Sequence, residues 1–256
     1  MPHIFPRHSE IKVEVCVESL KSAILSEKAG ADRIELNSAI GLGGLTPSLS
    51  SLKQIKSRIS LPVVCMVRPR SGNFCYSAEE FEVLLSEATS LLDRGADGLA
   101  VGMLDATGAV DEERLSIVKE ICGEKELVFH RAFDCTVDLN RAMHAIIQAG
   151  ANRVLTSGGQ LTAVQGTGTL SRLNAEFGDQ IEIIAAAGIS SGNAADLVLK
   201  TNCRQIHGTF SDIIETDCCF DPKLNFNEPL GLQPNQLRES SFEEIFQTIK
   251  NLRQLS

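Results

Sequence analysis

The sequence predicts an α/β protein with a single (β/α)8 TIM barrel, and three observations carry this prediction. First, helical stretches end at a Gly-Ala-Asp or Gly-Ala-Asn junction three times, at Gly30, Gly95 and Gly150. A glycine just past a helix adopts the left-handed conformation without a Cβ penalty, so each junction indicates a helix followed by a buried strand. Asn202 takes the glycine's place in a fourth copy.

Second, short apolar runs alternate with helical stretches, which is typical of a parallel sheet, and eight such runs in one chain favour a closed barrel. Third, the length of 256 residues matches the roughly 250 residues of one barrel. An open doubly wound sheet is the weaker alternative, because it would have a glycine fingerprint after the first strand. The chain continues there as Cys-Val-Glu-Ser over residues 16–19.

The elements follow in order along the chain. Strands are expected at 11–17, 33–36, 62–68, 98–101, 126–130, 153–156, 180–187 and 205–207. Apolar residues at three- and four-residue spacing predict helices at 47–59, 77–94, 111–121, 138–149, 162–177 and 190–201. A polar connection over 211–240 separates the barrel core, about 11–212, from a capped closing helix at about 241–253. We therefore expect one domain over residues 1–256.

Composition excludes several classes of partner. The net charge of −9 and the lack of a basic, aromatic-rich patch argue against nucleic acid. No long apolar run predicts a membrane span or a signal peptide, so we expect a cytoplasmic protein without a membrane partner. The eight cysteines include no Cys-x-x-Cys pair and are expected to be mostly reduced thiols. Barrels of this size often associate, and a homo-oligomer is expected.

Functional residues of such barrels lie at the C-terminal ends of the strands. Because side chains alternate along a strand and the apolar ones face the helices, the polar ones must face the barrel interior. Those predicted to point inward are Glu14, Cys16, Glu35, Asn37, Met66, Arg68, His130 and His207. Glu35 and Arg68 lie on adjacent strands and are expected to form an ion pair, since an unpaired buried charge is costly.

The loops after the strands suggest an anion site. Arg68 and Arg70 are suited to hold an anion, His130 to exchange a proton and Asp134 to fix the tautomer of His130. Backbone amides near Ser157, Gly158 and residues 187–191 are further candidates. The alternatives are a purely structural ion network and ordinary turn chemistry in these loops.

These segments resemble the copper homeostasis protein CutC family over about residues 11–212. The motifs that carry the resemblance occupy residues 14–16, 30–36, 43–48, 66–70, 74–77, 129–134 and 155–158. The resemblance implies a β/α barrel, small homo-oligomers and copper(I) binding, without an established reaction. It assigns Cys16 as a metal ligand, since copper(I) favours thiolates.

At residue 37 the chain departs from the family. Where the family commonly reads Glu-Leu-Cys, this chain reads Glu-Leu-Asn, and asparagine is a poor copper(I) ligand. Cys75, Cys135 or Met66 are possible substitutes for the missing thiol. Two functions therefore remain open, a copper-binding protein that uses Cys16 and an enzyme that performs acid–base chemistry on a small anionic metabolite.

Overall fold

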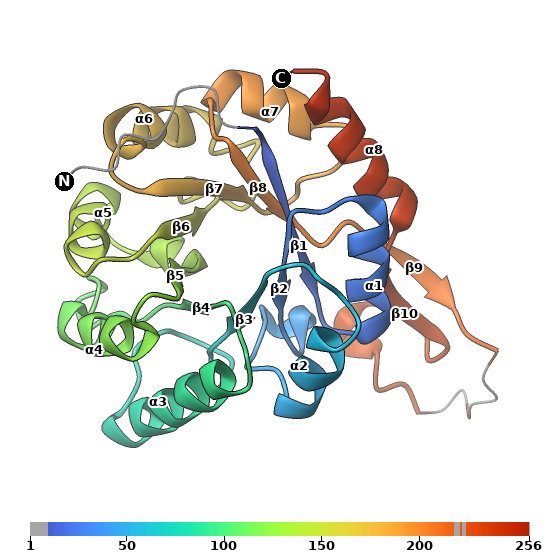
Figure 1. Ribbon diagram of the computed structural model, residues 1–256, viewed down its shortest axis with the longest axis horizontal. Helices are drawn as coiled ribbons and strands as arrows, with labels where there is room; N and C mark the ends of the chain where they lie inside the picture. Colours follow the sequence, from blue (N-terminus) through green and yellow to red (C-terminus); the bar gives the residue numbers. More distant parts are fainter. Residues whose placement is uncertain (1–9, 218–220, 222–223, 256) are drawn as a thin grey trace.

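Eight parallel strands form a closed barrel (Figure 1). The computed structural model of the protein describes residues 10–217, 221 and 224–255. Each strand pairs with its neighbour in the sequence, and β1 pairs with β8 to close the ring. The strands are β1 (Lys12–Val17), β2 (Arg33–Leu36), β3 (Val63–Met66), β4 (Gly98–Val101), β5 (Glu126–Phe129), β6 (Arg153–Thr156), β7 (Glu182–Ala186) and β8 (Gln205–Gly208). The predicted barrel is confirmed.

Helices surround the barrel (Figure 1). They are α1 (Leu20–Ala29), α2 (Leu49–Lys56), α3 (Ala78–Asp93), α4 (Glu112–Cys122), α5 (Leu139–Gln148), α6 (Thr167–Phe177), α7 (Ala194–Thr201) and α8 (Phe242–Arg253). Two short 3₁₀ helices follow strands, η1 (Ile40–Leu42) and η2 (Arg131–Cys135). The closing helix α8 packs beside α1 and α7.

Helix ends follow the predicted chemistry. Gly30 ends α1 with a φ of 90°, and Asn202 ends α7 with a φ of 56°. Asparagine tolerates this left-handed conformation better than most residues, which explains why it replaces glycine in the fourth junction. The helix predicted from residue 162 begins later, at Thr167, after Gly166, where a Cβ would lie 1.8 Å from Ser157 O.

Strand side chains separate into two layers as expected. Val13, Val63, Phe129 and Ile206 belong to the apolar layer between strands and helices. The apolar part of the barrel interior consists of Val64, Ala100, Val128, Leu155, Ile184 and Ala186. All six come from β3 to β7. The interior wall formed by β1, β2 and β8 contributes none of these apolar residues and carries the buried polar side chains of Glu14, Glu35 and His207.

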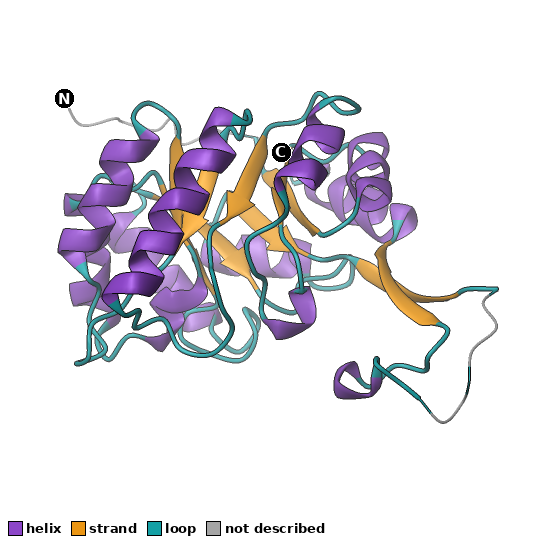
Figure 2. Ribbon diagram, turned by 90° about the horizontal axis from the view of Figure 1, so that it is seen from below, coloured by secondary structure: helices purple, strands orange, loops and turns teal. Residues whose placement is uncertain are grey.

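A two-stranded antiparallel hairpin projects from the barrel (Figure 2). It consists of β9 (Ser211–Glu215) and β10 (Gln236–Ser240), with the short helix η3 (Glu228–Leu230) between them. Sequence reasoning predicted only a polar connection here, because these strands show little apolar alternation. The hairpin is tied to α1 by the ion pair of Lys21 with Glu239. The adjacent Cys218 and Cys219 lie outside the described residues.

The lengths and hydropathies of the helices decide whether any of them could span a membrane. Within residues 10–217, 221 and 224–255, every helix is too short or too polar to cross a bilayer.

Candidate functional site

Three buried side chains on β1, β2 and β8 form a potential metal site. The Cys16 thiol, a Glu35 carboxylate oxygen and a His207 ring nitrogen lie within 4.8 Å of one another. Cys16 donates a hydrogen bond to Glu35 Oε2 at 3.6 Å. The register places Cys16 opposite Glu35 on adjacent strands, and β8 lies on the other side of β1. Three residues distant in sequence thus meet at one interior wall.

Glu14 orients the ring of His207 by contacting its Nδ1 atom. Its Oε1 lies 2.7 Å from His207 Nδ1, while its other oxygen accepts from Arg33. The second ring nitrogen, Nε2, points toward Glu35 Oε2 at 3.8 Å. A carboxylate that holds one nitrogen of a histidine leaves the other free for a metal, an arrangement found at many metal sites. The predicted inward positions of these four residues are confirmed.

Burial and neighbouring charges set the protonation of the cluster. Burial, reinforced by the Glu35 carboxylate, raises the pKa of the Cys16 thiol well above its usual value. Burial also raises the pKa of Glu35, against the opposing attraction of His207. Burial alone would lower the pKa of His207, but the carboxylates of Glu35 and Glu14 outweigh it and raise the pKa. Cys16 is therefore a protonated thiol at neutral pH when no metal is bound.

Asn37 completes this wall at the position where the resembled family commonly has a cysteine. Its side-chain amide donates to Glu35 Oε2 at 2.7 Å and lies 3.3 Å from the Cys16 sulfur. Its buried amide thus supports the cluster by hydrogen bonding. A cysteine at this position would place a second sulfur beside the first.

Arg68 does not pair with Glu35, and this expectation is wrong. Arg68 instead donates to three backbone carbonyls, those of Leu42, Gly44 and Gly72, at 2.8 to 3.0 Å. Its guanidinium turns toward the loops after β2 and β3, whereas Glu35 turns toward β1 and β8. The inward residues consequently form two groups, and Arg68 belongs to the second of them.

His130 also belongs to the second group, but Asp134 does not contact it. The Asp134 carboxylate accepts from the backbone amides of Ser157 and Gly159 at 3.0 to 3.1 Å and from Arg131. His130 Nδ1 accepts instead from the amide of Ala132 at 3.1 Å. The amides of Ser157 and Gly159 in the loop after β6 thus bind a carboxylate of the protein itself.

The remaining candidates have internal partners. Arg70 forms an ion pair with Glu80 of α3 and donates to Cys75 O at 2.9 Å. The amide of Gly158 donates to Thr156 Oγ1 at 2.8 Å. In the loop over 187–191, the Ser191 amide donates to Glu244 of α8. These contacts fix the loops in place.

Sequence reasoning missed a buried charged layer at the N-terminal end of the barrel. Arg153 is 1% exposed and contacts Glu126, and its Nη1 lies 3.9 Å from Glu14. Arg33 donates to Gln205 at 2.9 Å as well as to Glu14. The signal was present, because Arg33 precedes Glu35 by two residues and must face the same side.

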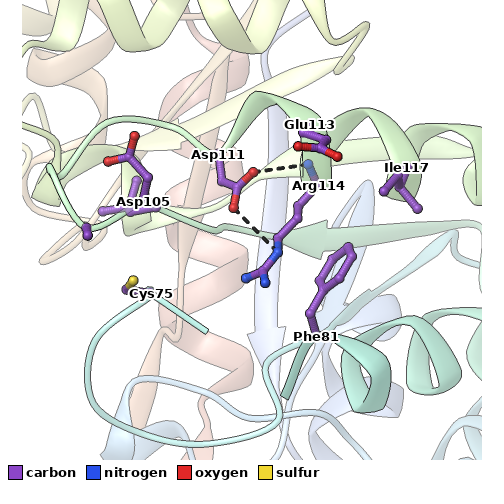
Figure 3. Close-up of a pocket in the computed structure, with 9 residues that line it drawn as sticks. Cys75, Phe81, Asp105, Asp111, Glu113, Arg114 and Ile117 are labelled. Atoms are coloured by element: carbon purple, nitrogen blue, oxygen red, sulfur yellow. Dashed lines mark hydrogen bonds and ion pairs between the residues drawn. The ribbon is translucent and has the colours of Figure 1, made fainter. Parts of the chain in front are cut away.

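A separate cavity of about 530 Å³ is lined by residues of α3, α4 and the loops after β3 and β4 (Figure 3). Asp111 and Arg114 face each other there, 3.5 Å apart, and the exposed Cys75 lies on another wall. Arg114 also donates to Tyr76 O at 2.7 Å and stacks on Phe81. Of the predicted substitute thiols, Cys75 thus faces this cavity.

Comparison with known proteins agrees with the fold. The CutC family model matches residues 11–212. A CutC family protein of Treponema denticola is 37% identical over 243 residues, which cover 94% of this chain and 99% of the relative. The crystal structure of the putative copper homeostasis protein CutC from Streptococcus agalactiae superimposes with a TM-score of 0.73 and 27% identity, covering 78% of this chain and 98% of that one.

A more distant structure shares only the barrel. Phosphoribosylanthranilate isomerase from Thermotoga maritima has a TM-score of 0.57 at 12% identity and covers 95% of this chain and 99% of its own. The family model covers most of the chain, and the Treponema protein is 37% identical over 94% of it, so both comparisons show the family of this chain. The chain belongs to the CutC family.

Proposed function

We propose that the protein serves copper homeostasis by binding one copper(I) ion between Cys16 Sγ and His207 Nε2. The observation that carries the proposal is the buried cluster of Cys16, Glu35 and His207, whose ligand atoms lie within 4.8 Å of one another. A relative of known structure is named for copper homeostasis, which supports the same reading.

The donor set fits a soft cation. A thiolate and a neutral imidazole are ligands that copper accepts. Glu14 holds Nδ1 of His207, so Nε2 is the coordinating atom and must release the proton that the raised pKa of the ring favours. The Cys16 thiol must lose its proton when the ion binds, because the thiolate is the ligand. Glu35 Oε2, 3.6 Å from the sulfur, is placed to accept that proton. The carboxylate therefore assists binding without being a preferred copper(I) ligand.

An acid–base enzyme at the barrel mouth is the weaker candidate. Burial and the charge of Arg68 lower the pKa of His130 to about 3, so its ring stays neutral near pH 7. A general acid or base works best when its pKa lies near the operating pH. Asp134, expected to orient His130, binds the loop after β6 instead. Neither residue is placed for the predicted proton transfer.

Copper(I) affinity is expected to depend on Cys16 and not on the exposed thiols. In an anaerobic titration against a chromogenic copper(I) chelator, Cys16→Ser should weaken binding by more than the roughly 10- to 100-fold cost of losing an outer-shell partner. Cys75→Ser and Cys135→Ser are matched controls, since both thiols are exposed, and they should bind like the native protein. Equal affinity of Cys16→Ser and native protein would refute the proposed site.

We also propose that the protein is cytoplasmic and that it forms a homo-oligomer. The six cysteines in the described part of the chain are all free thiols, in keeping with a reducing compartment. Leu237, 47% exposed, lies opposite the partly exposed Ile214 on one face of the projecting hairpin, which favours association through this face. Light scattering should give a mass above the 27.7 kDa of one chain, and a concentration-independent monomer would contradict the oligomer.

A further inference from the structure

Three buried polar side chains in or beside the loops after β3 and β5 each carry an atom without a hydrogen-bond partner among the described residues. The atoms are Arg68 Nε, Tyr76 Oη and His130 Nε2. Arg68, Tyr76 and His130 are only 5%, 4% and 3% exposed. Buried polar atoms are nearly always paired, because burial of an unpaired one costs free energy. Three such atoms in one region indicate that their partner is a molecule outside the chain.

The three side chains lie together at the mouth of the barrel. Arg68 Cζ lies 4.9 Å from the centre of the Phe74 ring, and the His130 ring lies 5.1 Å from the same ring, centre to centre. The charge of Arg68 acts on both others, since it opposes the burial-raised pKa of Tyr76 and adds to the burial that lowers the pKa of His130. Phe74 is therefore an apolar neighbour that Arg68 and His130 share, and Tyr76 is linked to this group through the nearby charge of Arg68.

Arg68 carries a buried positive charge, and the described residues place no negative charge beside it. Two of its nitrogens are occupied by the carbonyls of Leu42, Gly44 and Gly72. Among the described residues no carboxylate lies within ion-pair distance of it, in contrast to Arg33 and Arg153 at the other end of the barrel. A buried charge is normally paired, because its desolvation is not repaid otherwise. The missing partner should be negatively charged.

His130 presents a donor to this region. Its Nδ1 accepts from the Ala132 amide, and burial keeps the ring neutral, since its pKa falls to about 3. The single proton of a neutral imidazole is therefore on Nε2, the atom that lacks a partner. Gly102 makes room for the ring, because a Cβ there would lie 2.3 Å from His130 Cε1.

We propose that Arg68 Nε, Tyr76 Oη and His130 Nε2 bind an oxyanion, the carboxylate or phosphate group of a small molecule. Each group donates a hydrogen bond to the anion, and Arg68 supplies the countercharge. A metal ion does not fit here, because the guanidinium repels cations and His130 Nε2 carries a proton. The site is separate from the Cys16 cluster and does not rest on the copper proposal.

Tyrosine fluorescence can report anion binding at this site. Tyr76 is the only tyrosine and the chain has no tryptophan, so its intrinsic tyrosine emission reports on this site alone. Titration with inorganic phosphate and with acetate at pH 7 should produce a saturable change in that emission for at least one anion, whereas acetamide, a neutral analogue of acetate, should produce none. The anion that binds distinguishes a phosphate from a carboxylate ligand. Absence of saturation by either anion up to about 10 mM would overturn the proposal.

Variants locate the binding, with calorimetry as the readout. Tyr76→Phe removes a hydroxyl that lies beside Arg68 and has no well-aligned hydrogen bond to the described residues, so it should fold normally and weaken anion binding about tenfold. His130→Asn retains an acceptor for the Ala132 amide and should have a similar effect, and Arg68→Gln should abolish binding. Arg172→Gln, an exposed arginine paired with Glu176, is the matched control and should bind normally. Unchanged affinity in Tyr76→Phe and His130→Asn, or loss in Arg172→Gln, would mean surface binding and refute the site.

Discussion

Glu14→Gln is expected to lower the free energy of unfolding by about 3–5 kcal/mol, the cost of removing one partner from a buried ion pair. Glu14 is 2% exposed and contacts Arg33, His207 at 2.7 Å and Arg153 at 3.9 Å. Although burial favours the neutral acid, these neighbours hold the pKa of Glu14 well below its usual value. Glutamine keeps the shape of the side chain and removes the charge, which leaves two buried guanidinium groups poorly compensated.

Urea unfolding of the native and variant proteins measures this difference. Glu176→Gln is the matched control, because Glu176 also pairs with an arginine, Arg172, but both side chains are nearly half exposed. Exposed pairs contribute at most about 1 kcal/mol, so this variant should be almost as stable as the native protein. Similar losses in the two variants would show that burial of the Glu14 network does not govern its contribution.

Asn37→Cys is expected to increase copper(I) affinity at least about tenfold, because copper(I) prefers thiolate ligands. The Asn37 amide nitrogen lies 3.3 Å from Cys16 Sγ, so a sulfur on this side chain would lie beside the first one. The change also removes the hydrogen bond from Asn37 to Glu35, which holds the carboxylate in the cluster. The gain from the second thiolate should exceed that loss.

The chelator titration compares native protein, Asn37→Cys and Asn37→Ser. Serine has the shape of cysteine but is not a copper(I) ligand, so Asn37→Ser should bind no more tightly than the native protein. The double variant Cys16→Ser, Asn37→Cys should lose the gain if both sulfurs hold one ion. An Asn37→Cys protein with native affinity would place the copper site elsewhere.

Most of the fold could be predicted because it depends on local signals. The left-handed positions at Gly30 and Asn202 ended helices where the sequence indicated, and alternation along each strand placed Glu14, Cys16 and Glu35 inside. The β9–β10 hairpin escaped prediction, because its stability comes from pairing of two strands about twenty residues apart and from contacts with α1. Its sequence has neither a short hairpin turn nor clear alternation.

The partners within the site could not be predicted from alternation alone. Glu35 and Arg68 both point inward from adjacent strands, but Arg68 follows the end of β3 and reaches the carbonyls of neighbouring loops, while Glu35 faces β1. The direction of a long side chain depends on the conformation of the neighbouring loops, and the alternation of residues in the strands does not reveal that conformation. His207 was placed inward correctly, yet its contact with Glu14 requires closure of the ring between β8 and β1.

The proposed binding of copper(I) by Cys16 and His207 is tested most directly by X-ray absorption at the copper edge. The sample is protein loaded anaerobically with one equivalent of copper(I). The account predicts one sulfur and one imidazole nitrogen in the first shell, from Cys16 and His207. The sulfur should disappear in Cys16→Ser and a second sulfur should appear in Asn37→Cys. A first shell of sulfur atoms only in the native protein, unchanged by Cys16→Ser, would contradict the proposed site.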